Sequence, residues 1–179
     1  VRAKNCYAFN EEIQFSMKAD MRNKKFGSNV HKENNFNVLK TAGIYGPNNT
    51  GKTCLVKCIK AIKNVLLNKN KEIMPNIFTE STVCELGITF LFLGRKFAYD
   101  FKYDIKANAF IYESFLEILK DQYNNEKEIC WLKKATIGEE YECLDESLRD
   151  IIPVVSKTNL LYYVLDTGTF EYINKMKAI

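Results

Sequence analysis

One octapeptide constrains this chain more than any other segment: Gly46-Pro47-Asn48-Asn49-Thr50-Gly51-Lys52-Thr53. It matches the pattern G-x-x-x-x-G-K-[ST] at every fixed position, which is typical of loops that wrap phosphate groups. Gly46 lets the backbone turn sharply, and Gly51 lets it approach a ligand closely. Residues 48–53 would then present backbone N–H groups as a nest for an anion. The sequence therefore predicts a phosphate-binding loop, named here the 46–53 loop.

The side chains of this loop also have expected roles. Lys52 would reach the β- and γ-phosphates as a point charge, and the Thr53 hydroxyl would coordinate magnesium. A helix that starts directly after the loop would direct its positive end toward the same ligand. We expect ATP with Mg²⁺ as the ligand, held by Gly46, Asn48, Asn49, Thr50, Gly51, Lys52 and Thr53, with Thr53 as the metal ligand.

The segments on either side of the loop favour a strand before it and a helix after it. Residues 38–45 form a short apolar run that suits a buried strand. Residues 5–17 suit another strand, whereas residues 18–37 are polar and indicate a loop. After the 46–53 loop, apolar residues recur at helical spacing and form one stripe: Leu55, Ile59, Ile62 and Leu66.

The hydrophobic period changes in the middle of the chain. From residue 97 to 105, aromatic and aliphatic side chains alternate with polar ones, which predicts a strand with one buried face. Hairpin turns at 94–96 and 106–108 would join it to strands at 86–93 and 109–115, and residues 127–132 suit a further strand. We therefore expect an antiparallel subdomain within residues 83–132, followed by a mainly helical segment from residue 133 to 179.

Hydrolysis of a nucleotide needs a magnesium-sphere carboxylate at the end of an apolar strand, the Walker B element, and a group that orients water. Residues 144–146 contain an Asp-Glu pair, but acidic residues precede it. Residues 160–166 form an apolar run that ends at Asp166, but their spacing also suits a helix. The catalytic residues therefore stay unassigned, and we expect slow hydrolysis or none from this chain alone.

Composition sets wider limits. Hydrophobic residues make up 46% of the chain and charged residues 27%, as in an ordinary folded domain. The chain has neither a run of apolar residues long enough to cross a membrane nor a visible signal peptide, so we expect a cytoplasmic protein without membrane contact. The 6 cysteines form no C-x-x-C pair, which favours reduced thiols. The formal charge of +4 permits attraction to nucleic acid without demonstrating it.

Motifs in three regions resemble those of one known group. The 46–53 loop with Tyr45 before it, residues 5–17 and residues 94–101 are similar to the phosphate loop, the opening strand and the hairpin of ABC/SMC-type ATP-binding proteins of the AAA family. These are predicted ATPases of bacterial abortive-infection and phage-defence systems, related to the OLD and RecF ATPase heads. The resemblance implies that residues 1–179 form the N-terminal lobe of such an ATPase.

The resemblance also implies a fold and partners. The expected fold is α/β: a P-loop NTPase core (residues 1–68), an antiparallel β-subdomain (83–132) and C-terminal helices (133–179). The family's Walker B and signature motifs lie beyond this region, so a C-terminal half or a second ATPase head is an expected partner, and DNA is a further candidate. Asn5 and Phe9 become candidates for contacts with the nucleotide edge.

Two alternatives remain open at this point. The first is a self-sufficient small P-loop kinase or GTPase in which Asp166 or another group completes the site. The second is a non-catalytic interaction domain whose phosphate loop is vestigial. The chain shows no guanine-reading motif and no acceptor-binding motif, and every fixed position of the loop is intact, so ATP binding is the preferred prediction.

Overall fold

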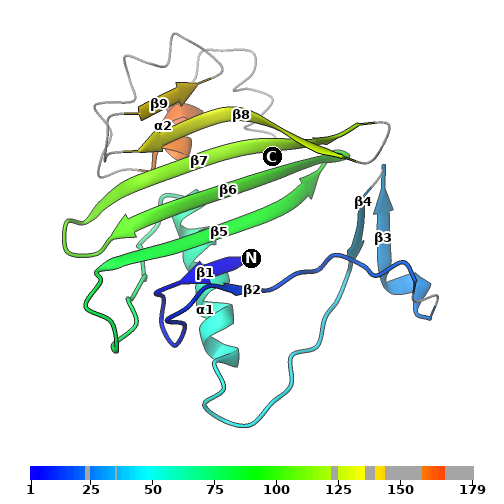
Figure 1. Ribbon diagram of the computed structural model, residues 1–179, viewed down its shortest axis with the longest axis horizontal. Helices are drawn as coiled ribbons and strands as arrows, with labels where there is room; N and C mark the ends of the chain where they lie inside the picture. The colour runs from blue at the N-terminus through cyan, green and yellow to red at the C-terminus, as the bar shows by residue number, and fades with distance from the viewer. Residues whose placement is uncertain (23–24, 35, 122–124, 136–139, 144–158, 168–179) are drawn as a thin grey trace.

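An antiparallel sheet of seven strands dominates the structure (Figure 1), with the spatial order β2-β1-β5-β6-β7-β8-β9. The computed structural model describes residues 1–179 except 23–24, 35, 122–124, 136–139, 144–158 and 168–179. The strands of this sheet are β1 (Arg2–Lys4), β2 (Ile13–Gln14), β5 (Val83–Phe92), β6 (Arg95–Asp104), β7 (Ala109–Lys120), β8 (Glu126–Ala135) and β9 (Glu140–Cys143). Each pairs with its neighbours in antiparallel register.

A separate hairpin and two helices complete the described chain. The hairpin is the two-stranded sheet of β3 (Val30–Glu33) and β4 (Phe36–Leu39), preceded by the short 3-10 helix η1 (Gly27–Asn29). Helix α1 (Lys52–Leu66) runs behind the sheet at β1 and β5, and α2 (Leu160–Thr167) lies near β7 to β9 (Figure 1).

The strands β5 to β8 follow from the sequence period. In β6, the buried side chains of Phe97, Tyr99, Phe101 and Tyr103 share one face, as the alternation predicted. Phe97 stacks on Phe115 of β7 with ring centroids 5.5 Å apart, which fixes the register of the two strands. The expected antiparallel region within residues 83–132 is therefore confirmed, and its strands extend from Val83 to Ala135.

The expected α/β P-loop core is wrong. All strand pairs in the described residues are antiparallel, whereas an α/β core needs parallel strands covered by helices. Residues 38–45 do not form a buried strand. The strand at this point ends at Leu39 and pairs with β3, and Ile44 and Tyr45 are 43% and 94% exposed. Residues 38–45 contain too few apolar side chains for a buried strand, because Lys40, Thr41 and Gly43 interrupt the apolar run.

The expectations for residues 5–37 were also wrong in part. Within residues 5–17 only Ile13–Gln14 form a strand, and residues 18–37 contain η1, β3 and the start of β4 rather than a simple loop. Asn5 and Tyr7 have positive φ angles of 50° and 52°, so the backbone turns where a continuous strand was expected. After this turn the ring of Phe9 lies against Gly51, directly before α1.

The helix after the 46–53 loop is confirmed, but its buried face differs from the predicted stripe. Leu55 and Ile62 are buried, whereas Ile59 is 38% exposed. The buried line also includes Cys58, Ala61 and Val65, and these small side chains let the helix lie close to the sheet. Hydrophobicity alone predicted that Ile59 would be buried, and no pattern of residue types indicated that Cys58 would face the core.

Candidate phosphate-binding loop

The 46–53 loop lies at the N-terminal end of helix α1, at the end of the helix that points away from β7 to β9 (Figure 1). Residues 46–50 are exposed, and Gly51 and Lys52 are half-buried. The structure therefore brings all seven predicted site residues into one continuous, solvent-accessible turn. It does not join this turn to a strand of the sheet, as the P-loop core would have required.

Gly51 lies directly before the first residue of helix α1. Its φ angle is 86°, in the left-handed region that disfavours side chains, and it is the N-cap of α1. A Cβ at this position would lie 3.1 Å from Cε1 of Phe9, so the ring of Phe9 packs against the glycine. Asn49 also has a positive φ angle, 65°. The turn thus uses residue types that adopt this conformation at low cost.

Lys52 folds back over the loop. Its ammonium donates hydrogen bonds to the carbonyl oxygens of Gly46, at 2.7 Å, and Pro47, and lies 3.3 Å from Oγ1 of Thr50. Thr50 in turn donates to the Pro47 carbonyl at 2.9 Å. These contacts hold a positive charge directly above the turn. A phosphate that entered the loop would compete with the two carbonyl oxygens for the ammonium.

The backbone N–H groups of the loop are available to a ligand. Within the described residues, none of the N–H groups from Asn48 to Thr53 donates to a protein acceptor, and the first such bond at this end of the helix runs from Leu55 N–H to the Gly51 carbonyl. The first turn of α1 has no acidic residue, and its N-cap makes no side-chain hydrogen bond. The positive end of the helix dipole is therefore not neutralised by the protein.

Thr53, whose hydroxyl is the predicted magnesium ligand, is exposed. Magnesium usually binds few protein groups and completes its shell with water and phosphate oxygens, so a single hydroxyl fits this chemistry. Within the described residues, no group of three or more His, Cys, Asp or Glu side chains is arranged to hold a metal. A metal at this loop would therefore depend on the nucleotide for most of its ligands.

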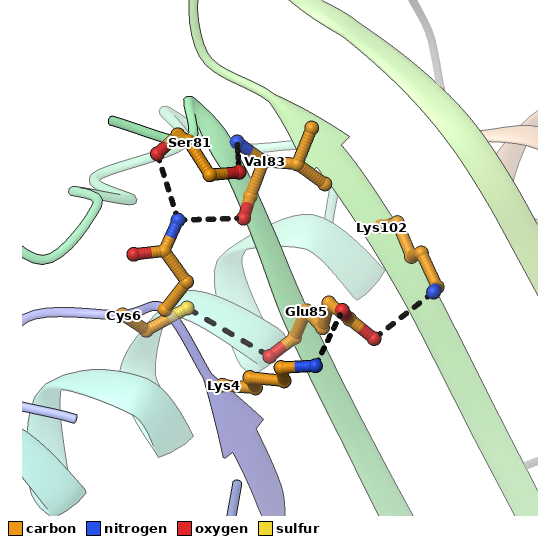
Figure 2. Close-up of polar contacts among 7 residues, drawn as sticks. Lys4, Cys6, Ser81, Val83, Glu85 and Lys102 are labelled. Atoms are coloured by element: carbon orange, nitrogen blue, oxygen red, sulfur yellow. Dashed lines mark hydrogen bonds and ion pairs between the residues drawn. The ribbon is translucent and has the colours of Figure 1, made fainter. Parts of the chain in front are cut away.

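The structure gives Asn5 a role in the fold instead of at a nucleotide. Its side chain is buried and donates to the carbonyl oxygens of Ser81 and Val83, at 2.8 and 2.9 Å (Figure 2). Its own oxygen accepts from the backbone N–H of Asn76 and the hydroxyl of Thr79. All of these contacts tie the β1 turn to the segment before β5. Phe9 lies beside the loop through Gly51, as described above.

Neighbouring contacts between β1, β5 and β6 are ionic and lie on the outer face of the sheet. Figure 2 shows Glu85 between Lys4 and Lys102, with N–O distances of 3.7 and 3.1 Å. Arg2 pairs with Asp100 on the same face. On the inner side of this region, Cys6 and Cys84 are fully buried, and the contact with Cys84, together with burial, raises the pKa of the Cys6 thiol. These thiols belong to the core.

Among the residues that the structure describes, none completes a hydrolytic site around the loop. Asp166 lies in the helix α2, so the strand that a Walker B carboxylate would need is absent at this place. Residues 144–146 lie outside the described residues. A buried carboxylate, that of Glu113 in β7, lies against the first residue of α2. It accepts hydrogen bonds from the Tyr99 hydroxyl at 2.7 Å and from Leu160 N–H at 2.9 Å.

Comparisons with known proteins do not assign this chain to a family. The chain matches no family model, no curated protein and no solved structure. In the part of the chain that the structure describes, no helix is long and apolar enough to span a membrane.

Proposed function

We propose that this chain binds ATP with Mg²⁺ through the 46–53 loop. One observation carries the proposal: the complete phosphate-loop pattern lies at the start of α1, where backbone N–H groups of the described residues have no protein acceptor. Unpaired N–H groups, an uncapped helix end and the Lys52 ammonium are complementary to a polyphosphate chain. The antiparallel fold around the loop limits the proposal to binding and gives no support to a P-loop core.

Each residue has a defined part in this proposal. The backbone of Asn48, Asn49 and Thr50 donates to phosphate oxygens. Lys52 leaves the carbonyl oxygens of Gly46 and Pro47 and moves to the phosphates, which offer full negative charge instead of carbonyl dipoles. Thr53 supplies the protein ligand for magnesium. Gly51 keeps the backbone close enough for the helix end to act on the same phosphates.

The resemblance to ABC/SMC-type ATPases extends the proposal to a second component. A C-terminal half or a second ATPase head would supply the carboxylate and signature contacts that the described residues lack around the loop. The proposed activity of this chain is therefore nucleotide binding alone. Hydrolysis of ATP, and its use in phage defence or in a DNA-associated process, would depend on the second component.

Isothermal titration calorimetry with Mg-ATP tests the proposal. Lys52→Ala should weaken binding at least about tenfold, because a charged hydrogen bond contributes roughly 1.5–3 kcal/mol. The matched control is Lys63→Ala, which removes an exposed lysine near the other end of α1. Equal affinities for the unaltered chain and Lys52→Ala would reject the loop as the binding site and support the vestigial alternative.

A second titration examines the metal and the base. Thr53→Ala should abolish the gain in affinity that Mg²⁺ gives over EDTA, whereas Thr53→Ser should keep it because serine also offers a hydroxyl. GTP should compete less well than ATP. Competition by GTP that equals or exceeds that of ATP would favour the small GTPase alternative.

A further inference from the structure

Lys52 is the first residue of α1, and its side chain is directed back over the 46–53 loop. Side chains of an α-helix tilt toward its N-terminal end, so a lysine at the first helical position reaches the residues that precede the helix. The Lys52 ammonium donates to oxygen atoms of Gly46, Pro47 and Thr50. An ammonium has three N–H donors, so these three oxygen atoms can engage all of them. This set of contacts is called here the closed arrangement of Lys52.

The Thr50 side chain is the centre of the closed arrangement. Its hydroxyl donates to the Pro47 carbonyl at 2.9 Å and accepts from the Lys52 ammonium at 3.3 Å. A hydroxyl can make both contacts at once, because it has one donor and two lone pairs. A Cβ at Gly46 would lie 3.2 Å from Oγ1 of Thr50, so the hydroxyl lies close to the first residue of the loop. Thr50 therefore connects the first turn of the loop to the lysine of the helix.

The closed arrangement separates Lys52 from the other lysines of α1. Lys52 is half-buried, although residues 46–50 beside it are exposed. Lys57, Lys60 and Lys63 of the same helix are exposed. The environment of Lys52 is therefore set by contacts within the loop, and Lys63 provides an internal reference for a lysine on the surface of α1.

The closed arrangement also affects any ligand that uses Lys52. Such a ligand must first draw the ammonium away from two carbonyl oxygens and a hydroxyl. When only some of the molecules are in the binding-competent arrangement, the apparent affinity falls by that fraction. The β- and γ-phosphates of a nucleotide are the groups expected to contact Lys52, so a nucleotide without them would not depend on the opening of the loop.

We propose that Thr50 is a positioning residue whose hydroxyl holds Lys52 in the closed arrangement, an autoinhibitory contact that a ligand with β- and γ-phosphates has to open. The identity of the ligand rests on the proposed function, whereas the closed arrangement rests on the contacts of the loop alone. Loss of the Thr50 hydroxyl should therefore free Lys52 in the absence of nucleotide and strengthen the binding of ATP.

Labelling of lysine amines tests the closed arrangement without any nucleotide. The full chain is treated with N-hydroxysuccinimidyl acetate, and mass spectrometry follows acetylation at each lysine. Lys52 should react more slowly than Lys63 of the same molecule. Thr50→Val has a similar shape but no hydroxyl, and it should raise the rate at Lys52 about twofold to tenfold, the factor that corresponds to one hydrogen bond. Thr50→Ser keeps a hydroxyl and should keep the slow rate, and Lys63 should react equally in all three proteins.

Calorimetric titrations test the autoinhibitory effect. Mg-ATP should bind Thr50→Val about twofold to tenfold more tightly than it binds the unaltered chain, because less free energy is needed to release Lys52. Thr50→Ser should bind Mg-ATP as the unaltered chain does. AMP lacks the β- and γ-phosphates, so its affinity should be the same for all three proteins. A role of Thr50 in the fold alone would not strengthen the binding of ATP selectively.

Three results would overturn the proposal. The first is equal labelling of Lys52 and Lys63 in the unaltered chain, and the second is an unchanged rate at Lys52 in Thr50→Val. The third is weaker binding of Mg-ATP by Thr50→Val, which would place the hydroxyl among the groups that hold the phosphates. If the unaltered chain binds no ATP, the proposed function is wrong, and the labelling rates still decide whether Thr50 holds Lys52.

Discussion

The ring of Phe9 lies against Gly51, with 3.1 Å between its Cε1 atom and the position that a Cβ on the glycine would take. The contact joins the turn after β1 to the residue that starts α1. Because the φ angle of Gly51 is 86°, two separate effects oppose any side chain there: backbone strain and the nearby ring.

Gly51→Ala should therefore destabilise the chain by roughly 1–2 kcal/mol and weaken Mg-ATP binding, because the loop must shift to relieve both effects. Chemical denaturation and calorimetry measure the two consequences. Gly27→Ala is the matched control, since a Cβ there meets nothing within 4 Å. In the double variant with Phe9→Leu, part of the lost stability should return, and full additivity of the two changes would show that the ring is not involved.

Glu113 should make the stability of the chain depend on pH. Burial raises the pKa of this carboxyl group from 4.5 to about 7, although Tyr99, the N–H groups of Leu160 and Leu161, and the nearby charge of Lys134 oppose the shift. Lys71 is also close enough to feel its charge. A raised pKa in the folded state means that the folded chain holds a proton that the unfolded chain releases.

The contribution of Glu113 should therefore be complete below pH 4.5 and should be lost as the pH rises through about 7. The loss should be on the order of 3 kcal/mol. Glu113→Gln keeps an oxygen that can accept from Leu160 and Tyr99 but cannot ionise, so it should flatten the fall in unfolding free energy over this range. Urea titrations at several pH values measure the difference, and parallel pH profiles for the two proteins would contradict the assignment.

Removal of Arg95 should leave the buried carboxylate of Glu117 without its cationic partner. The guanidinium of Arg95 forms two hydrogen bonds with Glu117, which is 3% exposed and also accepts from Nε1 of Trp131 at 3.2 Å. Arg95→Ala should cost about 1.5–3 kcal/mol, the range for a hydrogen bond to a charged group, because Glu117 loses a partner that its burial requires. Arg22→Ala breaks the exposed pair with Asp20 and should leave the denaturation midpoint unchanged. A similar small effect for both variants would mean that water reaches Glu117.

The isolated chain should hydrolyse ATP very slowly or not at all. The 46–53 loop offers N–H groups, Lys52 and Thr53, which stabilise bound nucleotide and its transition state alike and therefore raise affinity without raising kcat. A phosphate-release assay with Lys52→Ala as the contamination control measures this. Turnover of about 1–10 s⁻¹ that disappears in the variant would show that the chain contains a catalytic carboxylate, and Asp166 would be the first residue to test.

The sequence predicted those parts of the fold that depend on neighbours along the chain. The alternation at residues 97–105 placed Tyr99 and Phe101 on the buried face, and turn residues placed the hairpins on either side. The 46–53 loop and the start of α1 also depend on consecutive residues. These features are local, so a pattern of residue types was enough to identify them.

Parts of the fold that depend on distant partners were missed. Asn5 was expected near a nucleotide, but its side chain satisfies carbonyl groups of Ser81 and Val83, which no local pattern connects to it. The phosphate-loop pattern usually follows a strand of a parallel sheet, which is why a parallel sheet was expected. The strand before the loop, Phe36–Leu39, instead pairs with β3 in a short antiparallel hairpin.

The order of strands also has a consequence for how the chain acquires its structure. Strands β5 to β8 are joined in sequence order, so they can pair through short loops with a small entropic cost. Strand β1 must find β5 across a long stretch of chain, and the Arg2–Asp100 contact spans 98 positions. On a ribosome the phosphate loop emerges well before the strands that support α1. The loop should therefore reach its folded conformation only after β5 has been synthesised. A nascent chain that stops before β5 would contain the phosphate-loop sequence without the strands on which α1 packs.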